Sequence, residues 1–204
     1  TQGLRQPGSA LKPFAYLTAF KKGYSPEVVL FDAPTEFVPN NPKCPILVDF
    51  LKEGKECFHP RNFDEKFRGP VSFRDALAQS VNIPSVKVLY LAELEDTLKT
   101  LHDFGITTLK EAGRYGLSLV LGGGEVKLID LVGAYSGLAQ EGVRRDQTMI
   151  LEIKDGQGEI IESYKDQGER VADAQYVRLV NDILSDISAR SPLFQASLGL
   201  TVYP

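Results

Sequence analysis

The first apolar segment of the chain has helical spacing and is apolar on nearly every face. The positions that repeat at three- and four-residue intervals are Leu11, Phe14, Ala15 and Leu17. A helix with so little polar surface is expected to be buried, and Gly23 is a plausible end. Pro13 has no amide hydrogen, which costs little in the first turn of a helix. The pattern therefore predicts a buried helix that begins close to Ser9.

The segment 23–69 has no sustained hydrophobic period and is rich in proline. Only residues 27–31, with the sequence EVVLF, have the character of a short strand. Long irregular stretches are uncommon in compact domains unless they are functional or pack on something larger. We therefore expect a long loop here with one short strand.

A short helix is predicted after this loop, because Ser72 and Asp75 have the spacing of an N-terminal capping box. It is expected to end near residues 80–82. Pro84 disfavours helical geometry at the residue before it and suits the first turn of a new helix. The tripeptide Ser-Val-Asn at 80–82 should thus form a tight link between two helices, where its side chains can project into a cleft.

Further helices and turns are predicted in the second half of the chain. A helix over 93–104 ends at Gly105, and a hairpin over 149–164 turns at the sequence DGQG. A helix over 174–187 precedes an apolar tail. The helix that ends at Gly142 has core spacing at Leu128, Leu131, Val132, Tyr135 and Leu138.

Three consecutive glycines, Gly122 to Gly124, join an apolar run, expected to be extended, to this helix. Glycines before a helix can cradle a phosphate group. The chain lacks the G-x-x-x-x-G-K-[S/T] pattern of a phosphate-binding loop, because no lysine followed by serine or threonine stands at the required place. A structural tight turn is the favoured interpretation.

Length and charge limit the classes of function. The chain has 204 residues, of which 43% are hydrophobic and 25% charged, so it fits one domain or a domain with a small subdomain. A net charge of −4 and the lack of a basic run argue against a nucleic-acid partner. No apolar run approaches the roughly 18–20 residues of a membrane span, and no signal peptide is evident. The chain begins without methionine, so we expect a piece of a longer protein, attached to a membrane only through an anchor outside this sequence.

Cysteine and histidine are too sparse to predict a metal site. Cys44 and Cys57 form no C-x-x-C pair, and His59 and His102 do not complete a zinc pattern. We therefore expect no metal and no cofactor. A disulfide between the two cysteines is compatible only with an oxidising compartment.

Ser9 and Lys12 form a candidate catalytic pair. Three residues apart on a helix, they lie on the same face, one turn from each other. A serine hydroxyl becomes a good nucleophile when a neighbouring base accepts its proton, and a lysine can act as that base if burial keeps it partly neutral. The positive end of the helix favours negative charge that develops near Ser9. The competing interpretation is a serine that simply caps the helix.

A second element, Ser80-x-Asn82, favours the catalytic interpretation. Ser-x-x-Lys followed by a Ser-x-Asn variant is typical of serine β-lactamases and penicillin-binding proteins. Around these motifs the chain contains, in order, the runs PGSALKPF, GPVSFRDALAQSVNIPSVKVLYLA, FGITTL, YGLSLVLGGGEVKLIDLVGAY and LVNDILSD. In these runs the chain resembles the transpeptidase domain of bifunctional class A penicillin-binding proteins, most closely the subtype labelled 1C.

The resemblance implies a D-alanyl-D-alanine transpeptidase that cross-links peptidoglycan stem peptides and is acylated by β-lactams. It makes Ser9 the nucleophile, Lys12 its proton acceptor, Ser80 a proton relay to the leaving group and Asn82 a donor to the bound peptide. The backbone N–H of Ser9 would supply half of the oxyanion hole. The implied location is the periplasmic face of the bacterial inner membrane.

The resemblance also implies an α+β fold of the penicillin-binding-protein and serine β-lactamase type. Residues 1–204 are expected to form part of such a domain, mainly its helical side with one short hairpin, and to lack most of the central sheet. The third family motif, Lys-Thr-Gly, is absent from the sequence, and so is a glycosyltransferase domain. We therefore expect the piece alone to be inactive. Two alternatives remain open, a serine β-lactamase-like hydrolase and a peptide-sensing module without catalysis.

Overall fold

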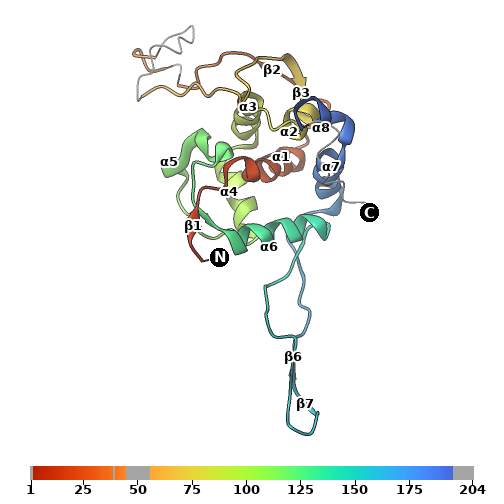
Figure 1. Cartoon of the computed structure of the whole chain (residues 1–204). Coiled ribbons are helices and arrows are strands. Elements are labelled where there is room, and N and C mark those ends of the chain that lie inside the picture. The colour runs from red at the N-terminus through yellow and green to blue at the C-terminus, as the bar shows by residue number, and fades with distance from the viewer. Residues whose placement is uncertain (1, 39, 45–55, 195–204) are drawn as a thin grey trace.

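The computed structural model describes residues 2–38, 40–44 and 56–194, and in these ranges helices dominate over short strands. One helix, α1 (Lys12–Lys21), lies in the middle of the helical body (Figure 1). The helices that surround it are α2 (Phe73–Ala78), α3 (Asn82–Ala92), α4 (Leu94–Asp103) and α7 (Ala174–Ser185). The remaining helical elements are α5 (Ala112–Tyr115), α6 (Leu128–Ala139), α8 (Ile187–Phe194) and the 3₁₀ helices η1 (Gly8–Leu11) and η2 (Gly116–Leu121).

Helix α1 is buried along almost its whole length, as its apolar pattern predicts. Every residue from Lys12 to Phe20 is buried, and Phe14 packs edge-on against Phe104 of the segment after α4 and Tyr135 of α6. A helix that contacts neighbours on all sides is a rigid support for groups at its N-terminus.

The strands pair only two by two in the described part of the chain, and every pair is antiparallel. The pair of β2 and β3, with Leu30 opposite Val71, packs against α2 and α3. The pairs are β1 (Leu4–Arg5) with β4 (Val126–Lys127), β2 (Val29–Asp32) with β3 (Gly69–Ser72), β5 (Val143–Arg144) with β8 (Glu169–Arg170), and β6 (Glu152–Lys154) with β7 (Ile160–Ser163). Helices with short strands give an α+β fold, as predicted.

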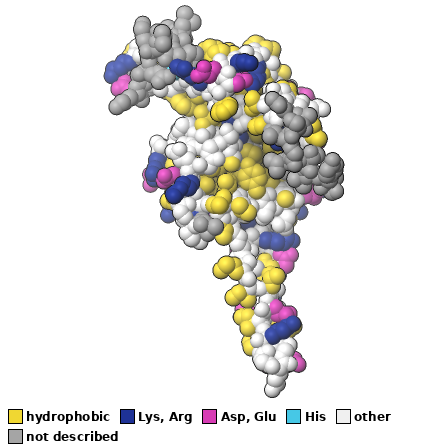
Figure 2. Space-filling view, viewed as in Figure 1, with side chains coloured by type: hydrophobic (Ala, Val, Ile, Leu, Met, Phe, Trp, Pro, Cys, Tyr) yellow, Lys and Arg dark blue, Asp and Glu magenta, His cyan; other side chains and the backbone are white. Residues whose placement is uncertain are grey.

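The hairpin of β6 and β7 projects away from the helical body (Figure 1). Its turn is the DGQG sequence, where Asp155 Oδ1 accepts hydrogen bonds from the backbone N–H groups of Gln157 and Glu159. Hydrophobic side chains line one side of the projection (Figure 2). The exposed ones in this segment are Met149, Ile150, Leu151, Ile153, Ile160, Ile161 and Tyr164. The sequence thus predicted this hairpin correctly.

Ser72 is confirmed as the N-cap of α2, the main element of the predicted capping box. Ser72 Oγ accepts a hydrogen bond from the backbone N–H of Asp75 at 3.0 Å and donates one to the Asp75 carboxylate at 2.7 Å. The helix ends at Ala78, and Ser80 has a positive φ of 55°. This reversal of the backbone creates the tight link between α2 and α3.

Several expectations about local structure were wrong. The run before the three glycines, expected to be extended, is the 3₁₀ helix η2, because an unbroken apolar run does not distinguish a strand from a buried helix. Leu128 and Val132 are 57% and 60% exposed rather than in the core. The apolar tail after α7, for which no element was predicted, includes a further helix, α8.

Candidate functional site

Ser9 lies in η1, the 3₁₀ turn that leads into α1, and is exposed. The α-helix proper begins at Lys12 with Pro13 in its first turn, so the predicted start near Ser9 was three residues too early. The N-cap of η1 is Pro7, and neither η1 nor α1 has a side-chain cap. The capping interpretation of Ser9 is therefore wrong, and its hydroxyl is not committed to the helix end.

Lys12 is almost completely buried, with 1% of its surface exposed. Its Nζ donates hydrogen bonds to the backbone O of Ser80 at 2.6 Å, to Ser80 Oγ at 3.1 Å and to Asn82 Oδ1 at 2.8 Å. Burial removes water from the ammonium group and lowers the pKa of Lys12 to about 7. Both the charged and the neutral amine are therefore populated near neutral pH.

The link between α2 and α3 brings Ser80 and Asn82 to Lys12, although they are 68 and 70 residues away in sequence. Ser80 has a positive φ, and its carbonyl and hydroxyl oxygens both face the lysine amine. The Asn82 side chain is held at its other end, where Nδ2 donates to the carbonyl O of Arg61 at 2.7 Å. Lys12 thus joins the two motifs in one hydrogen-bonded group.

Ser9, Lys12 and Ser80 line one cavity of about 230 Å³. Asn82 is not a lining residue and reaches the cavity through Lys12. The other lining residues come from α1, α2, α6, α7 and α8, and are Pro13, Leu77, Ala78, Tyr135, Leu184, Arg190 and Phe194. A hydroxyl, an amine and a second hydroxyl in one cavity can transfer protons between neighbouring groups.

Tyr135 is a residue of this cavity that the sequence pattern placed only in the core. Its hydroxyl donates a hydrogen bond to the carbonyl O of Ala10 at 3.0 Å, which fixes the turn directly after Ser9. Burial raises the pKa of Tyr135 to about 12, so this hydroxyl remains a donor at neutral pH. No motif in the sequence indicates this contact, because it joins residues 125 positions apart.

The first of the three glycines, Gly122, also supports the turn that carries Ser9. Gly122 has a φ of +93°, and a Cβ atom at this position would overlap the backbone of Gly8. Gly8 itself has a φ of +59°. The absence of a side chain therefore lets η2 approach η1, which agrees with the structural interpretation of these glycines.

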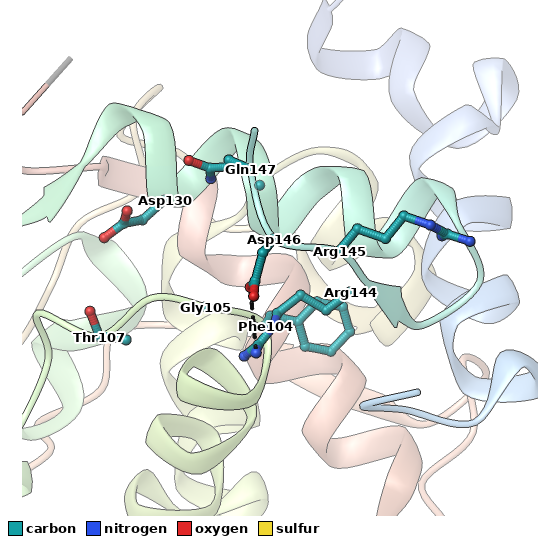
Figure 3. Close-up of a pocket in the computed structure, with 9 residues that line it drawn as sticks. Phe104, Gly105, Thr107, Asp130, Arg144, Arg145, Asp146 and Gln147 are labelled. Atoms are coloured by element: carbon teal, nitrogen blue, oxygen red, sulfur yellow. Dashed lines mark ion pairs between the residues drawn. The ribbon is translucent and has the colours of Figure 1, made fainter. Parts of the chain in front are cut away.

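A larger cavity of about 380 Å³ lies elsewhere and does not include Ser9, Lys12 or Ser80 (Figure 3). Its arginines are engaged in ion pairs. Arg144 lies 3.8 Å from Asp146 and 3.4 Å from Glu169, and Arg145 lies 2.6 Å from Asp166. In Figure 3 the Arg145 side chain points away from Thr107 and Asp130. Size alone thus does not identify the functional cavity, and the chemistry favours the smaller one.

Cys44 and Cys57 are joined in a disulfide, with Cα atoms 5.4 Å apart. Their sulfurs and a Glu36 carboxylate oxygen lie within 4.8 Å of one another, the only such metal-compatible cluster found within residues 2–38, 40–44 and 56–194. Glu36 is hydrogen bonded to His59 at 2.9 Å, and disulfide sulfurs are not thiolate ligands.

None of the helices in the described residues 2–38, 40–44 and 56–194 combines the length and apolar character that a membrane crossing needs.

Comparison with known proteins identifies the class. The family model of the penicillin binding protein transpeptidase domain matches residues 1–202. The fold is similar to that of penicillin-binding protein 1A from Haemophilus influenzae, with a TM-score of 0.76 and 21% identity over 98% of this chain and 31% of that one. PonA1 from Mycobacterium tuberculosis in complex with penicillin V has a TM-score of 0.71 at 18% identity, over 94% of this chain and 49% of that one. The chain therefore belongs to the penicillin-binding protein transpeptidase domain family.

Curated relatives place it beside the class A members of this family. Penicillin-binding protein 1A of Aquifex aeolicus is 32% identical over 97% of this chain and 25% of that protein. Penicillin-binding protein 1C of Escherichia coli is 34% identical over 68% of this chain and 16% of that protein. The chain thus spans about a fifth of the length of the curated relatives that it matches.

Proposed function

We propose that this chain supplies the nucleophile part of a peptidoglycan D-alanyl-D-alanine transpeptidase, with Ser9 as the residue that is acylated. The observation that carries the proposal is the environment of Lys12, a buried amine that lines the same cavity as Ser9 and contacts Ser80 and Asn82. A buried lysine whose pKa lies near 7 is a competent proton acceptor at neutral pH. Family membership agrees with this role.

In this mechanism the neutral amine of Lys12 accepts the proton of Ser9 as Ser9 Oγ attacks the carbonyl carbon between the two D-alanines. The backbone N–H of Ser9 donates to the oxyanion that forms, as half of an oxyanion hole. Loss of one such donor typically lowers a rate by about 10²–10³-fold, so the second donor of the oxyanion hole is also needed for a fast reaction. The tetrahedral intermediate collapses to a Ser9 ester when the amine of the terminal D-alanine leaves.

Ser80 has the position of a proton relay in this scheme. Its Oγ lies 3.1 Å from Lys12 Nζ, so the proton taken from Ser9 passes from Lys12 through Ser80 to the leaving amine. Attack by an amine of a second stem peptide on the ester then forms the cross-link and frees Ser9. One hydrogen of Asn82 Nδ2 bonds to Arg61, and the other donates to the bound peptide in this proposal.

The proposal extends to the inhibitors and the location. β-Lactams acylate Ser9 by the same attack, an interpretation in line with the penicillin V complex of a protein of the same fold. A disulfide between Cys44 and Cys57 suits an oxidising compartment, such as the periplasmic face of the inner membrane. Residues 1–204 form part of the transpeptidase domain in this proposal. A Lys-Thr-Gly strand outside them completes the site, so the piece alone is inactive.

Labelling of the full-length protein with a fluorescent penicillin tests the function. We expect a persistent adduct that mass spectrometry locates on Ser9, and its loss in Ser9→Ala. Ser163→Ala, an exposed serine of β7, is the matched control and should label normally. No adduct under conditions that label a known transpeptidase would refute the acylation. Rapid nitrocefin turnover would favour a hydrolase instead, and normal cross-linking in cells that carry Ser9→Ala would favour a peptide-sensing module.

A further inference from the structure

Asn62, in the long segment between β2 and β3, is 4% exposed and uses both polar atoms of its amide. Its Nδ2 donates to the Asp32 carboxylate oxygens at 2.8 and 2.9 Å and to the carbonyl O of Lys66 at 2.7 Å. Its Oδ1 accepts from the backbone N–H of Asn82 at 3.0 Å and of Ile83 at 3.4 Å. One side chain thus connects the end of β2 with the start of α3.

These backbone donors belong to the first turn of α3 and have no partner within the helix. The N-cap residue Val81 makes no side-chain hydrogen bond to them. Asn62 therefore caps α3 from a segment about 20 residues earlier. The cap is made at Asn82, the residue whose side chain contacts Lys12.

Asp32 fixes the orientation of the Asn62 amide. It is fully buried and also accepts a hydrogen bond from the backbone N–H of Arg68 at 3.0 Å. A carboxylate only accepts hydrogen bonds, so it directs the Asn62 NH₂ group toward itself and the Asn62 oxygen toward α3. If the Asn62 amide were reversed, its oxygen would face the Asp32 carboxylate and the Lys66 carbonyl, which are both acceptors. Its NH₂ group would face the two backbone N–H groups at the start of α3.

The same segment also determines how the Asn82 amide points. The carbonyl O of Arg61 can only accept, so it takes Asn82 Nδ2 and leaves Asn82 Oδ1 for Lys12. Arg61 and Asn62 thus hold the side chain and the backbone of Asn82, respectively. A reversed Asn82 amide would place an NH₂ group against the lysine amine, where two donors meet.

We propose that Asn62, oriented by Asp32, is a positioning residue that holds Asn82 so that its amide oxygen meets Lys12. The proposal rests on the proposed acylation of Ser9. It assigns Asn62 no contact with the substrate. Its effect is on the alignment of Lys12 with Ser9, and small displacements of a catalytic group can lower a rate by about 10²-fold.

The test compares acylation of the full-length wild type and Asn62→Ala by a penicillin, under conditions where both are folded. We expect the first-order acylation rate constant to fall by about 10- to 100-fold, while the constant for non-covalent binding of the penicillin changes little. Leu101→Ala is the stability control, because it removes a fully buried side chain of α4 that takes no part in this network. A folded Asn62→Ala variant with the same rate constant as Leu101→Ala would overturn the proposal.

The exchange of the two side chains, Asn62→Asp with Asp32→Asn, separates positioning from general destabilisation. In the double variant the carboxylate at position 62 would still accept from α3, and the amide at position 32 would donate to that carboxylate, while the carbonyl O of Lys66 would lose its donor. The acylation rate is therefore expected to recover above that of Asn62→Asp alone, and no recovery in a folded double variant would count against positioning. If Asn62→Ala does not fold, Asp32→Asn is measured instead. We expect its acylation rate constant to be at least about threefold lower than that of the wild type, and an unchanged rate constant would refute the proposal. Absence of acylation in the wild type would instead refute the proposed function itself.

Discussion

Raising the pH from 6 to 8 is expected to increase the rate of Ser9 acylation about tenfold, because Lys12 must be neutral to accept the proton. Burial places the pKa of Lys12 near 7 rather than at its ordinary value of 10.5. The neutral fraction is then about 10% at pH 6, about half at pH 7 and about 90% at pH 8. The rate should therefore rise with pH and level off above pH 8.

The same burial determines the size of the effect at neutral pH. The two pKa values differ by about 3.5, which corresponds to roughly 5 kcal/mol in the relative free energies of the charged and neutral amine. An unperturbed lysine would be neutral in only about one molecule in three thousand at pH 7. Burial of the amine thus raises the concentration of active base by about a thousandfold.

The assay is the acylation rate of the full-length protein by a fluorescent penicillin, measured from pH 5.5 to 9 at constant ionic strength. Lys12→Arg keeps the positive charge at every pH, because arginine does not deprotonate in this range. We expect its rate to fall by about 10²–10⁴-fold. Lys110→Arg, at an exposed lysine, should reproduce the wild-type profile. A wild-type profile that is flat between pH 6 and 8, or a Lys12→Arg variant with normal acylation, would refute Lys12 as the base.

Three further predictions concern two supports of the site and the disulfide. Tyr135→Phe removes the hydrogen bond to Ala10 and should lower the free energy of unfolding by about 0.5–1.5 kcal/mol in urea titrations and slow acylation; equal stability and rate would exclude this role. Gly122→Ala should cost about 1–3 kcal/mol from its positive φ alone and slow acylation further by displacing Gly8; a wild-type rate would show that the contact does not position Ser9. Replacement of both disulfide cysteines by serine should cost about 3 kcal/mol, measured against the oxidised protein; an unchanged urea midpoint would contradict a stabilising crosslink.

The local sequence was sufficient to predict the elements that are stabilised by contacts between residues close together in the chain. The all-round apolar surface of residues 12–20 required a buried helix, and Ser72 caps α2 at the backbone N–H of Asp75 as expected. The DGQG turn specified its hairpin. In each case the decisive interaction joins residues a few positions apart, so the periodicity and the turn chemistry contain it.

Packing decided what the local pattern left open. The run at 116–121 is apolar whether it is extended or helical, and only its fit against neighbouring elements makes it the 3₁₀ helix η2. Val132 has core spacing on α6, yet 60% of its surface is exposed in the described structure. Spacing shows which residues share a face and does not show which face is covered.

The features of the candidate site can also be divided into those that the local sequence predicted and those that packing decided. The sequence determined that Ser9 and Lys12 lie close to each other near a helix start, because their spacing is local. Only the tertiary structure brought Ser80 and Asn82 to Lys12, placed Tyr135 on Ala10 and joined Asn62 to the start of α3. These contacts span 20 to 125 residues and form only when the helices pack around α1. The same packing excludes water from the lysine amine. That exclusion, which no local pattern records, gives Lys12 its low pKa.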